Sequence, residues 1–424
     1  MLRQVLERGV PLDALLDETH GTAHFRALGS RDRALARAIL TTALRRRGQI
    51  KAVLSERLDK PLPPGSEALA AILHIGAAQI LFLDVPDHAA VDLAVTQAAG
   101  DHRSRNAKGL VNSVLRRLAR ERAGIVGRPG PGSVNAPAWL FERWSAAYGE
   151  EGAEAIAEAH LRPPGLDFSV RADAEVWAER LGGTVLPTGT VRVAEMRRVS
   201  ALPGYDEGAW WVQDAAAALP AKLLGDVAGT EVADLCAAPG GKTAELAAAG
   251  ARVTAVDLSE RRLKRVAANL ARLRLQAEPI VADVLLWEPG RRFGGVLLDA
   301  PCSATGTIRR HPDVQWLKRP EDIAALAGLQ ARLLDRAAQL VEPGGLLVFC
   351  TCSLEPEEGE AQVSPFLARN AEFRLEPVDA IELAGLAHLI GPAGTVRTLP
   401  SHGFGPGDGA AGMDGFFAAR FRRG

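Results

Sequence analysis

An alternation of strands and helices in the second half of the chain constrains the fold more than any other feature of the sequence. From about residue 228 onward, short apolar runs of β type alternate with segments of helical periodicity. Such an alternation is typical of a parallel sheet with helices on both faces. We expect strands at 231–236, 252–257, 278–283, 295–300, 346–352 and 415–421, and helices at 242–249, 259–273, 321–340 and 357–369.

The chain is too long, at 424 residues, for one ordinary core. Residues 1–124 have helical periodicity throughout, and the Gly- and Pro-rich residues 125–137 indicate a linker. Residues 138–220 combine a long helix with short strands. The predicted architecture is therefore multidomain: an all-α domain, a linker, a small helical and α+β connector, and an α/β domain at 221–424.

The net charge of −1 hides an asymmetry between the two parts of the chain. Residues 1–130 contain 20 Lys and Arg against 13 Asp and Glu, a balance of +7, whereas the remainder holds 30 against 38, a balance of −8. A basic module suggests contact with a polyanion such as a nucleic acid. Lys108, Arg116 and Arg117 share a predicted helix and are the candidate phosphate contacts, with a solvated helix face as the alternative.

Several other classes of protein are disfavoured by composition. No apolar stretch approaches the roughly 20 residues needed to span a bilayer, so no membrane partner is expected. Four cysteines do not make a disulfide scaffold in a chain of this size, which fits a reducing cytoplasm. Cys350 and Cys352 form the only C-x-C pair and lack a matching Cys/His pair, so no metal site is expected.

A turn of small residues follows the first strand of the α/β domain. It consists of Cys236, Ala237, Ala238, Pro239, Gly240 and Gly241, and Lys242 opens the next helix. Small residues let a ligand approach the backbone, and the N–H groups of the helix then face it. Asp257 ends the second strand, where a carboxylate can accept both hydroxyls of a ribose. Asp283 ends the third and would bracket an adenine-like ring.

Three kinds of cofactor compete for this turn. A dinucleotide oxidoreductase would require G-x-G-x-x-G, which is absent. A P-loop ATPase is the stronger rival because Gly241-Lys242-Thr243 looks like the end of its phosphate loop. However, Cys236 replaces the first glycine of that loop, and Pro239 removes a backbone N–H from the cradle. S-adenosyl-L-methionine has a ribose and an adenine but no phosphate, and the sequence favours it.

Two cysteines stand at the carboxyl ends of predicted strands. Cys302 follows the run 296–301, and Cys352 follows 346–351. The carboxyl ends of parallel strands line the ligand crevice, so both thiols would meet over one ligand. A single strand cysteine is usually buried and inert, and Cys350, inside its strand, is assigned to that class. The pairing of Cys302 with Cys352 beside a cofactor turn instead favours covalent chemistry.

Methylation of carbon 5 of a pyrimidine explains the need for a thiol. That carbon becomes nucleophilic only after a thiolate adds to carbon 6, and a free thiol, with a pKa of about 8.5, is only a few per cent ionised at pH 7. The site must therefore lower this pKa or remove the proton during attack. Asp299 would bind or protonate an edge of the base, and Arg309 and Arg310 would bind a substrate phosphate. Spacing does not decide which of Cys302 and Cys352 attacks.

Several segments resemble those of a known family. They are residues 202–214 (LPGYDEGAWWVQD), 234–243 (DLCAAPGGKT), 299–306 (DAPCSATG), 351–353 (TCS) and 414–417 (DGFF). The chain resembles the RNA (cytosine-5) methyltransferases of the Nop/Sun family. Residues 88–91 and 108–117 in turn resemble the NusB-like helical RNA-binding domain. Together these resemblances cover nearly the whole chain, as in the bacterial family members that act on small-subunit (16S) ribosomal RNA.

The resemblance implies roles that spacing leaves open. Cys352 would attack carbon 6, and Cys302 would assist release of the product from the covalent adduct. The turn and Lys242, with Asp257, Asp283 and Asp299, would bind S-adenosyl-L-methionine on a class I, Rossmann-like fold. The implied partner is small-subunit ribosomal RNA, unassembled or partly assembled, and the implied enzyme is a cytoplasmic monomer. A transfer RNA cytosine-5 methyltransferase and a non-catalytic RNA-binding assembly factor remain as alternatives.

Overall fold

The computed structural model describes residues 1–127, 130–194, 198–404 and 412–424, and these form two compact units. The helical unit comprises Met1–Arg162 and Ile308–Lys318. The α/β unit comprises Pro163–Thr307 and Arg319–Gly424. Residues 138–220, which we expected to form one connector, are therefore shared between the two units.

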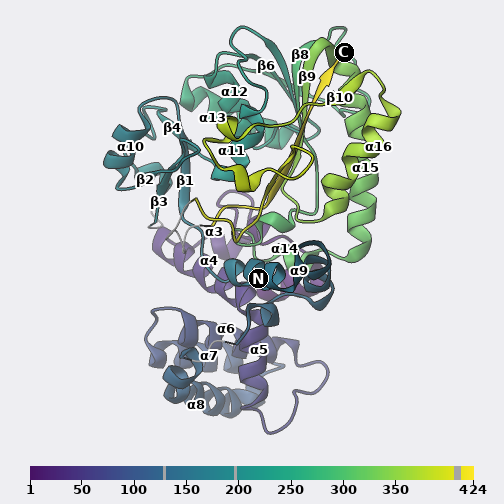
Figure 1. The fold of residues 1–424 in the computed structure, drawn as a ribbon. Coiled ribbons are helices and arrows are strands. Elements are labelled where there is room, and N and C mark those ends of the chain that lie inside the picture. Colours follow the sequence, from purple (N-terminus) through teal and green to yellow (C-terminus); the bar gives the residue numbers. More distant parts are fainter. Residues whose placement is uncertain (128–129, 195–197, 405–411) are drawn as a thin grey trace. The chain divides into compact units, whose positions relative to one another are not determined.

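The first unit is all-helical, as the periodicity predicted (Figure 1). Its α-helices are α1 (Leu2–Arg8), α2 (Leu12–Leu15), α3 (Ala23–Arg26), α4 (Ser30–Arg45), α5 (Arg47–Ser55), α6 (Glu67–Phe82), α7 (Asp87–Gly100), α8 (Lys108–Val126), α9 (Ala138–His160) and α14 (Val314–Leu317). Helix α6 is apolar on most of its surface and lies at the centre of this unit's core. At Gly76 a Cβ would come within 2.6 Å of Leu115 Cδ1, so the glycine allows α8 to approach α6 closely. In the parts of the chain with described coordinates, no helix is long and apolar enough to cross a membrane.

Two segments join the helical unit unexpectedly. The described part of the predicted linker packs closely, since Asn135 is buried and its Oδ1 accepts a hydrogen bond from Gln49 N at 3.0 Å. Residues 308–318 lie between a strand and a helix of the α/β unit in sequence, yet they pack in the helical unit. There Asp313 Oδ2 accepts from Leu12 N at 2.8 Å, and Trp316 Nε1 donates to Leu44 O at 3.0 Å.

The α/β unit opens with a small antiparallel sheet in the strand order β2-β3-β1-β4. It contains β1 (Leu166–Val170), α10 (Ala174–Leu181), β2 (Thr184–Val185), β3 (Val191–Val193) and β4 (Trp210–Val212). The Phe168 and Trp210 rings meet edge to face in its core, 4.6 Å between centroids. The buried Asp167 and Arg192 form an ion pair at 2.6 Å on the neighbouring strands β1 and β3.

The large sheet has the strand order β10-β12-β9-β8-β5-β6-β7, with β11 paired to β12. Its strands are β5 (Glu231–Leu235), β6 (Arg252–Asp257), β7 (Glu278–Val281), β8 (Phe293–Asp299), β9 (Val341–Thr351), β10 (Phe373–Leu375), β11 (Val396–Thr398) and β12 (Phe416–Arg423). The neighbours from β7 to β9 are parallel, as predicted. The last predicted strand is β12, but it runs antiparallel to β9, so the sheet is mixed.

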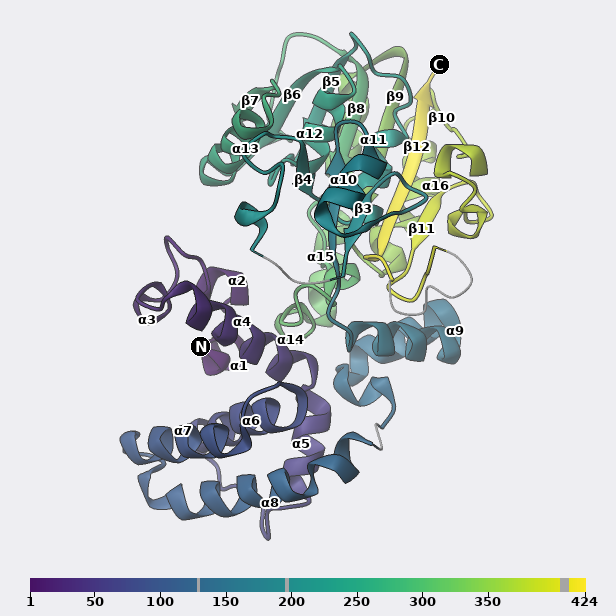
Figure 2. The ribbon, with the colours of Figure 1, turned by 90° about the vertical axis from the view of Figure 1, so that its left-hand side faces the viewer.

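Helices cover both faces of this sheet (Figures 1 and 2). They are α11 (Ala215–Lys222), α12 (Gly241–Ala248) and α13 (Glu260–Leu273) on one face, and α15 (Pro320–Leu340) and α16 (Glu360–Arg369) on the other. Leu297 and Val348 point into the core between the sheet and helices α11 and α12. Leu298 and Phe349 point into the core on the other face, under α15 and α16. This alternation along each strand leaves the loops after the strands free to carry the site.

Candidate active site

The predicted catalytic and cofactor-binding residues gather at the carboxyl ends of β5, β6, β7, β8 and β9. The parallel register places Leu235 beside Leu298, and Asp299 beside Cys350. The turn that follows β5 therefore neighbours the segments that follow β8 and β9. We take this edge of the sheet as the candidate active site.

The turn after β5 is fixed by hydrogen bonds to the next strand. Ala237 N donates to Val256 O at 3.0 Å, and Ala238 N donates to Asp257 Oδ2 at 3.1 Å. Gly240 has a φ of +99°, and a Cβ there would lie 2.9 Å from Val266 Cγ1, so both its conformation and its packing require glycine. Burial raises the pKa of Cys236 to about 12, which makes this thiol inert at neutral pH.

Two carboxylates stand beyond this turn in the positions predicted for binding a ribose and an adenine. Asp257 is buried at the end of β6; its Oδ1 accepts from Ser259 N at 2.9 Å, and Oδ2 lies 3.2 Å from Arg262 Nη1. Asp283 follows β7, and its Oδ1 accepts from Leu285 N at 3.0 Å. Backbone N–H groups therefore orient both carboxylates at the carboxyl end of the parallel strands.

Lys242 and Asp299 form the charged centre of the site. Lys242 is 8% exposed, and its Nζ lies 2.8 Å from Asp299 Oδ2 and 5.0 Å from the centroid of the Phe416 ring. Burial alone would lower the pKa of Lys242, but the charge and the hydrogen bond of the Asp299 carboxylate outweigh it, so the pKa is raised. The other carboxylate oxygen of Asp299 accepts from Cys350 Sγ at 3.5 Å. The ammonium group is thus retained beside Cys350 and Cys352.

The two thiols expected to meet lie side by side. Cys302 Sγ and Cys352 Sγ are 3.4 Å apart, and both side chains are half-buried. The hydrogen bond with Cys302, together with burial, raises the pKa of Cys352 well above its ordinary value. Cys352 therefore rests as a thiol, and its proton must leave as it attacks. Cys350 is fully buried, and burial raises its pKa strongly, in keeping with the structural role expected of it.

Hydrogen bonds join the loop of Cys302 to that of Cys352. Gly306 N donates to Cys352 O at 3.0 Å, and Leu354 N donates to Thr305 Oγ1 at 2.9 Å. Gly306 O in turn accepts from Gly415 N at 2.8 Å, which ties in the segment before β12. These hydrogen bonds hold together the segments after β8 and β9 and the segment before β12, which are distant in the sequence. The sequence motifs included Thr305 and Gly306, but spacing gave no sign of these contacts.

The geometry argues against the ATPase alternative. Thr243 Oγ1, which would bind Mg²⁺ in a phosphate loop, donates instead to Asp234 Oδ2 at 2.5 Å. Burial raises the pKa of Asp234 to about 7. The carboxyl end of the parallel sheet carries the carboxylates of Asp257, Asp283 and Asp299. Their negative charge disfavours a polyphosphate and suits a cationic, phosphate-free nucleoside cofactor.

The residues predicted to contact RNA belong to the helical unit. Lys108 and Arg116 are exposed on α8, whereas Arg117 forms an ion pair with Glu121 at 2.9 Å. Arg309 is only 4% exposed, and its backbone carbonyl accepts from Arg45 Nη2 at 2.7 Å. This burial counts against the phosphate contact predicted for Arg309. Arg310 is half-buried in the same segment.

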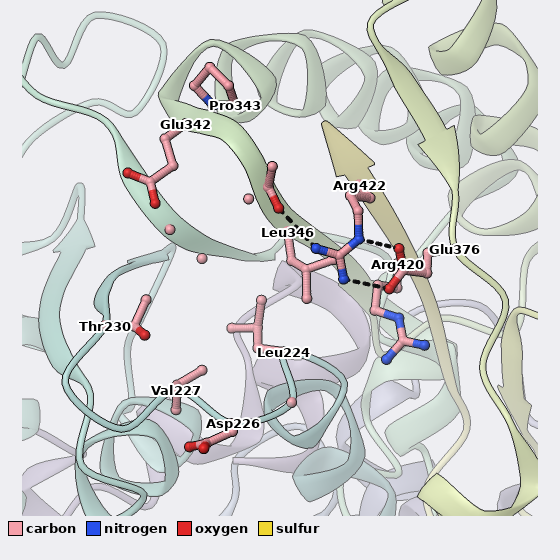
Figure 3. A pocket seen from close by; sticks show the side chains of 15 residues that line it. Leu224, Asp226, Val227, Thr230, Glu342, Pro343, Leu346, Glu376, Arg420 and Arg422 are labelled. Atoms are coloured by element: carbon pink, nitrogen blue, oxygen red, sulfur yellow. Dashed lines mark hydrogen bonds and ion pairs between the residues drawn. The ribbon is translucent and has the colours of Figure 1, made fainter. Parts of the chain in front are cut away.

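A pocket elsewhere in the α/β unit does not belong to this site. The pocket has a volume of about 520 Å³ and lies at the amino ends of β8 and β9, where Gly294 and Leu346 line it. Figure 3 shows it from close by. Its Arg422 side chain pairs with Glu376 and donates to Gly344 O at 2.9 Å. Leu346 and Cys352 are separated by about 20 Å along the strand direction, so the pocket and the thiols lie at opposite ends of the sheet.

Comparison with known proteins decides the family. Residues 221–422 match the model of the family described as 16S rRNA methyltransferase RsmB/F, and residues 1–120 match the NusB family. The ribosomal RNA small subunit methyltransferase B of Vibrio cholerae is 36% identical over 406 residues, which cover 92% of this chain and 89% of that protein. The chain belongs to the RsmB/F family.

Other comparisons agree. The ribosomal RNA small subunit methyltransferase B of Pectobacterium carotovorum is 35% identical over 98% of this chain and 95% of its own length. The crystal structure of PH0851 has a TM-score of 0.71 at 26% identity, covering 94% of this chain and 92% of that one. A methyltransferase homologue from Pyrococcus horikoshii has a TM-score of 0.55 at 28% identity, covering 68% and 95% of the two chains.

Membership of the RsmB/F family confirms the predicted fold class and the predicted enzyme class. The chain is an S-adenosylmethionine-dependent ribosomal RNA methyltransferase with an N-terminal NusB domain. The resemblance to the Nop/Sun family, drawn from the motifs, is therefore correct. The individual roles of the site residues depend on the geometry described above.

Proposed function

We propose that this RsmB/F-family enzyme methylates carbon 5 of a cytosine in 16S ribosomal RNA, with Cys352 as the nucleophile and Cys302 as the residue that releases the product. The observation that carries the proposal is the 3.4 Å separation of the two sulfur atoms beside the Lys242–Asp299 pair. Carbons 5 and 6 of a pyrimidine are adjacent, so two thiols this close can act on one ring.

In the first step the Cys352 sulfur bonds to carbon 6 and its proton is lost to solvent. The nearby Lys242 ammonium favours the thiolate by charge attraction, which opposes the effects of Cys302 and burial on its pKa. Asp299 binds the polar edge of the base, and its position between Lys242 and Cys350 fixes its orientation. The attack leaves carbon 5 as an enamine-type nucleophile.

The turn after β5 and the carboxylates of Asp257, Asp283 and Asp299 would hold S-adenosylmethionine. When bound, this cofactor supplies an electrophilic methyl group. Asp257 would accept the ribose hydroxyls. Asp283 would lie beside the adenine, and Asp299 would lie nearest the reacting atoms because its strand adjoins both β5 and β9.

Release requires removal of the carbon 5 proton. Cys302, after giving its own proton to solvent, takes the carbon 5 proton as the carbon 5–carbon 6 double bond re-forms and the bond from Cys352 to carbon 6 breaks. The proton then passes from Cys302 to the Cys352 thiolate across the contact between them, and Cys302 regains a proton from solvent, which restores the starting state. The hydrogen bond with Cys302 and burial raise the pKa of Cys352, which favours its return to the thiol form.

The helical NusB domain at residues 1–124 would bind the RNA. Lys108 and Arg116 offer exposed charges on α8, and Arg117 lies beside them. The proposed substrate is ribosomal RNA before or during assembly, and the proposed enzyme is a cytoplasmic monomer. Replacement of Lys108 and Arg116 by Gln should lower affinity and reduce the salt dependence of binding by about two phosphate contacts.

Bisulfite sequencing of RNA incubated with the enzyme and S-adenosylmethionine tests the activity. Protein-free 16S transcript should acquire one or more new 5-methylcytosines, and Cys352→Ala should abolish them. Methylation of a transfer RNA transcript in preference to the 16S transcript would favour the transfer RNA alternative. Binding of 16S RNA without methylation of either RNA would favour the assembly factor.

A further inference from the structure

A buried carboxylate lies behind the two thiols. Glu358 ends a short 3-10 helix, Pro356–Glu358, and is fully buried. Four donor groups converge on its two carboxylate oxygens: Ser303 N at 2.9 Å, Gln330 Nε2 at 3.0 Å, Ser353 Oγ at 2.6 Å and Ser303 Oγ. A carboxylate has about four acceptor positions, so these bonds use its full capacity.

The donors come from the segments that carry the thiols. Ser303 directly follows Cys302, and Ser353 directly follows Cys352. Gln330, on α15, also donates to Pro301 O at 2.9 Å, which holds the residue before Cys302. The Glu358 carboxylate thus links the loop of Cys302 to that of Cys352, and links both loops to α15.

The sheet itself does not fix both thiols. Strand β8 ends at Asp299 and β9 at Thr351, so Cys302 and Cys352 both lie beyond the paired strands. The loop of Cys302 needs other contacts to hold its sulfur against that of Cys352. Hydrogen bonds to a carboxylate are stronger than those between neutral groups, which suits Glu358 to this task.

We propose that Glu358 is a positioning residue that keeps Cys302 and Cys352 at the separation that attack and release require. It contacts neither substrate nor cofactor in this account and acts through Ser303 and Ser353. The inference deepens the proposed function, since it rests on the roles given there to the two thiols. No sequence pattern pointed to Glu358, because its partners Ser303 and Gln330 lie 55 and 28 residues away.

The test uses Glu358→Gln, which keeps the shape of the side chain but places an NH₂ group against donors. The amide oxygen of Gln can keep the bonds from Ser303 N and Gln330 Nε2, which share Oε1. The NH₂ group replaces the oxygen on which Ser303 Oγ and Ser353 Oγ converge, so the variant loses both charge-assisted hydroxyl bonds. Glu357→Gln is the matched control, because it removes the same charge from the exposed neighbour on the same 3-10 helix. Glu358→Asp, which keeps the charge on a shorter stem, serves if the amide variant does not fold.

The first readout is the distance between the thiols, measured without catalysis. Diamide oxidises two adjacent thiols to a disulfide and takes up both hydrogens, and peptide mass spectrometry quantifies the Cys302–Cys352 product. The full-length enzyme and the Glu357→Gln control should form this disulfide rapidly. The folded Glu358 variants should lose most of that rate, and a rate equal to that of the control would overturn the proposal.

The second readout is methylation. A misplacement of about 1 Å can cost about 100-fold in rate, so kcat should fall by up to that factor while KM for RNA stays unchanged. Loss of disulfide formation with normal kcat would also overturn the proposal. If Cys352→Ala remains active, the proposed roles of the thiols fail instead, and the diamide rates still report whether Glu358 positions them.

Discussion

Replacement of Gly306 by Ala tests the contact between the loop of Cys302 and the rest of the site. A Cβ at Gly306 would lie 1.9 Å from Gly415 O, and the atoms it meets next are also backbone. Real Cβ contacts start at about 3.0 Å, so the two segments must separate by about 1.1 Å. No flexible side chain is available to absorb this movement.

The shift acts directly on the thiols. Gly306 N binds Cys352 O at 3.0 Å, and the same residue lies four positions after Cys302. We expect kcat for RNA methylation to fall by about 100-fold, the cost of a displacement of this size at reacting groups. Thermal unfolding should show a loss of about 1–3 kcal/mol from overpacking, so the protein stays folded enough to assay.

Gly328→Ala provides the control. Gly328 is an exposed residue of α15, and nothing lies within 4 Å of a Cβ placed there. This variant should gain up to about 1 kcal/mol of stability from helix propensity and keep its activity. A Gly306→Ala enzyme with the kcat of Gly328→Ala would refute the idea that this close approach sets the positions of the thiols.

Two predictions concern the helical unit. Trp316→Ala removes the hydrogen bond to Leu44 O and the indole ring, whose centroid lies 4.5 Å from Arg47 Cζ. The free energy of urea unfolding should fall by about 3 kcal/mol. An unchanged value would show that residues 308–318 do not stabilise this unit. Burial lowers the pKa of His160 to about 3, so below about pH 6.5 the unfolded state binds a proton that the folded state does not. Stability should therefore fall by up to about 1.4 kcal/mol per pH unit between pH 6.5 and 5 on this account, and His160→Gln should show a smaller slope than the unaltered protein. Equal slopes for His160→Gln and the unaltered protein would show that His160 does not cause this pH dependence.

The sequence predicted the parallel strands β5 to β9 well, because each is an extended run with a residue of the predicted site at or just after its carboxyl end, whereas β10 and β11 were not predicted. The parallel strands and the helices that follow them agree with the periodicity. The direction of β12 did not follow from the sequence, since its apolar run suits either direction of pairing. Its hydrogen bonds to β9, including the pairing of Ala418 with Cys350, fix that direction only in the folded state.

The sequence was less informative about which residues support the site and about where residues 308–318 pack. Arg309 looked like a phosphate ligand because it follows the Cys302 loop and stands in a basic run. Charge gave no indication that the segment folds into the helical unit, where Arg309 is buried. Likewise, Glu358 stands in an acidic run typical of a solvated surface, yet hydrogen bonds from distant segments hold it in the core.

Trapping of a protein–RNA adduct tests directly whether Cys352 attacks the base and Cys302 releases the product. Cys302→Ala, incubated with 16S transcript and S-adenosylmethionine, should accumulate a complex that survives denaturing electrophoresis, because methyl transfer is complete but release is blocked. Cys352→Ala should form no such complex. An adduct that appears with Cys352→Ala, or that never accumulates with Cys302→Ala, would contradict the account.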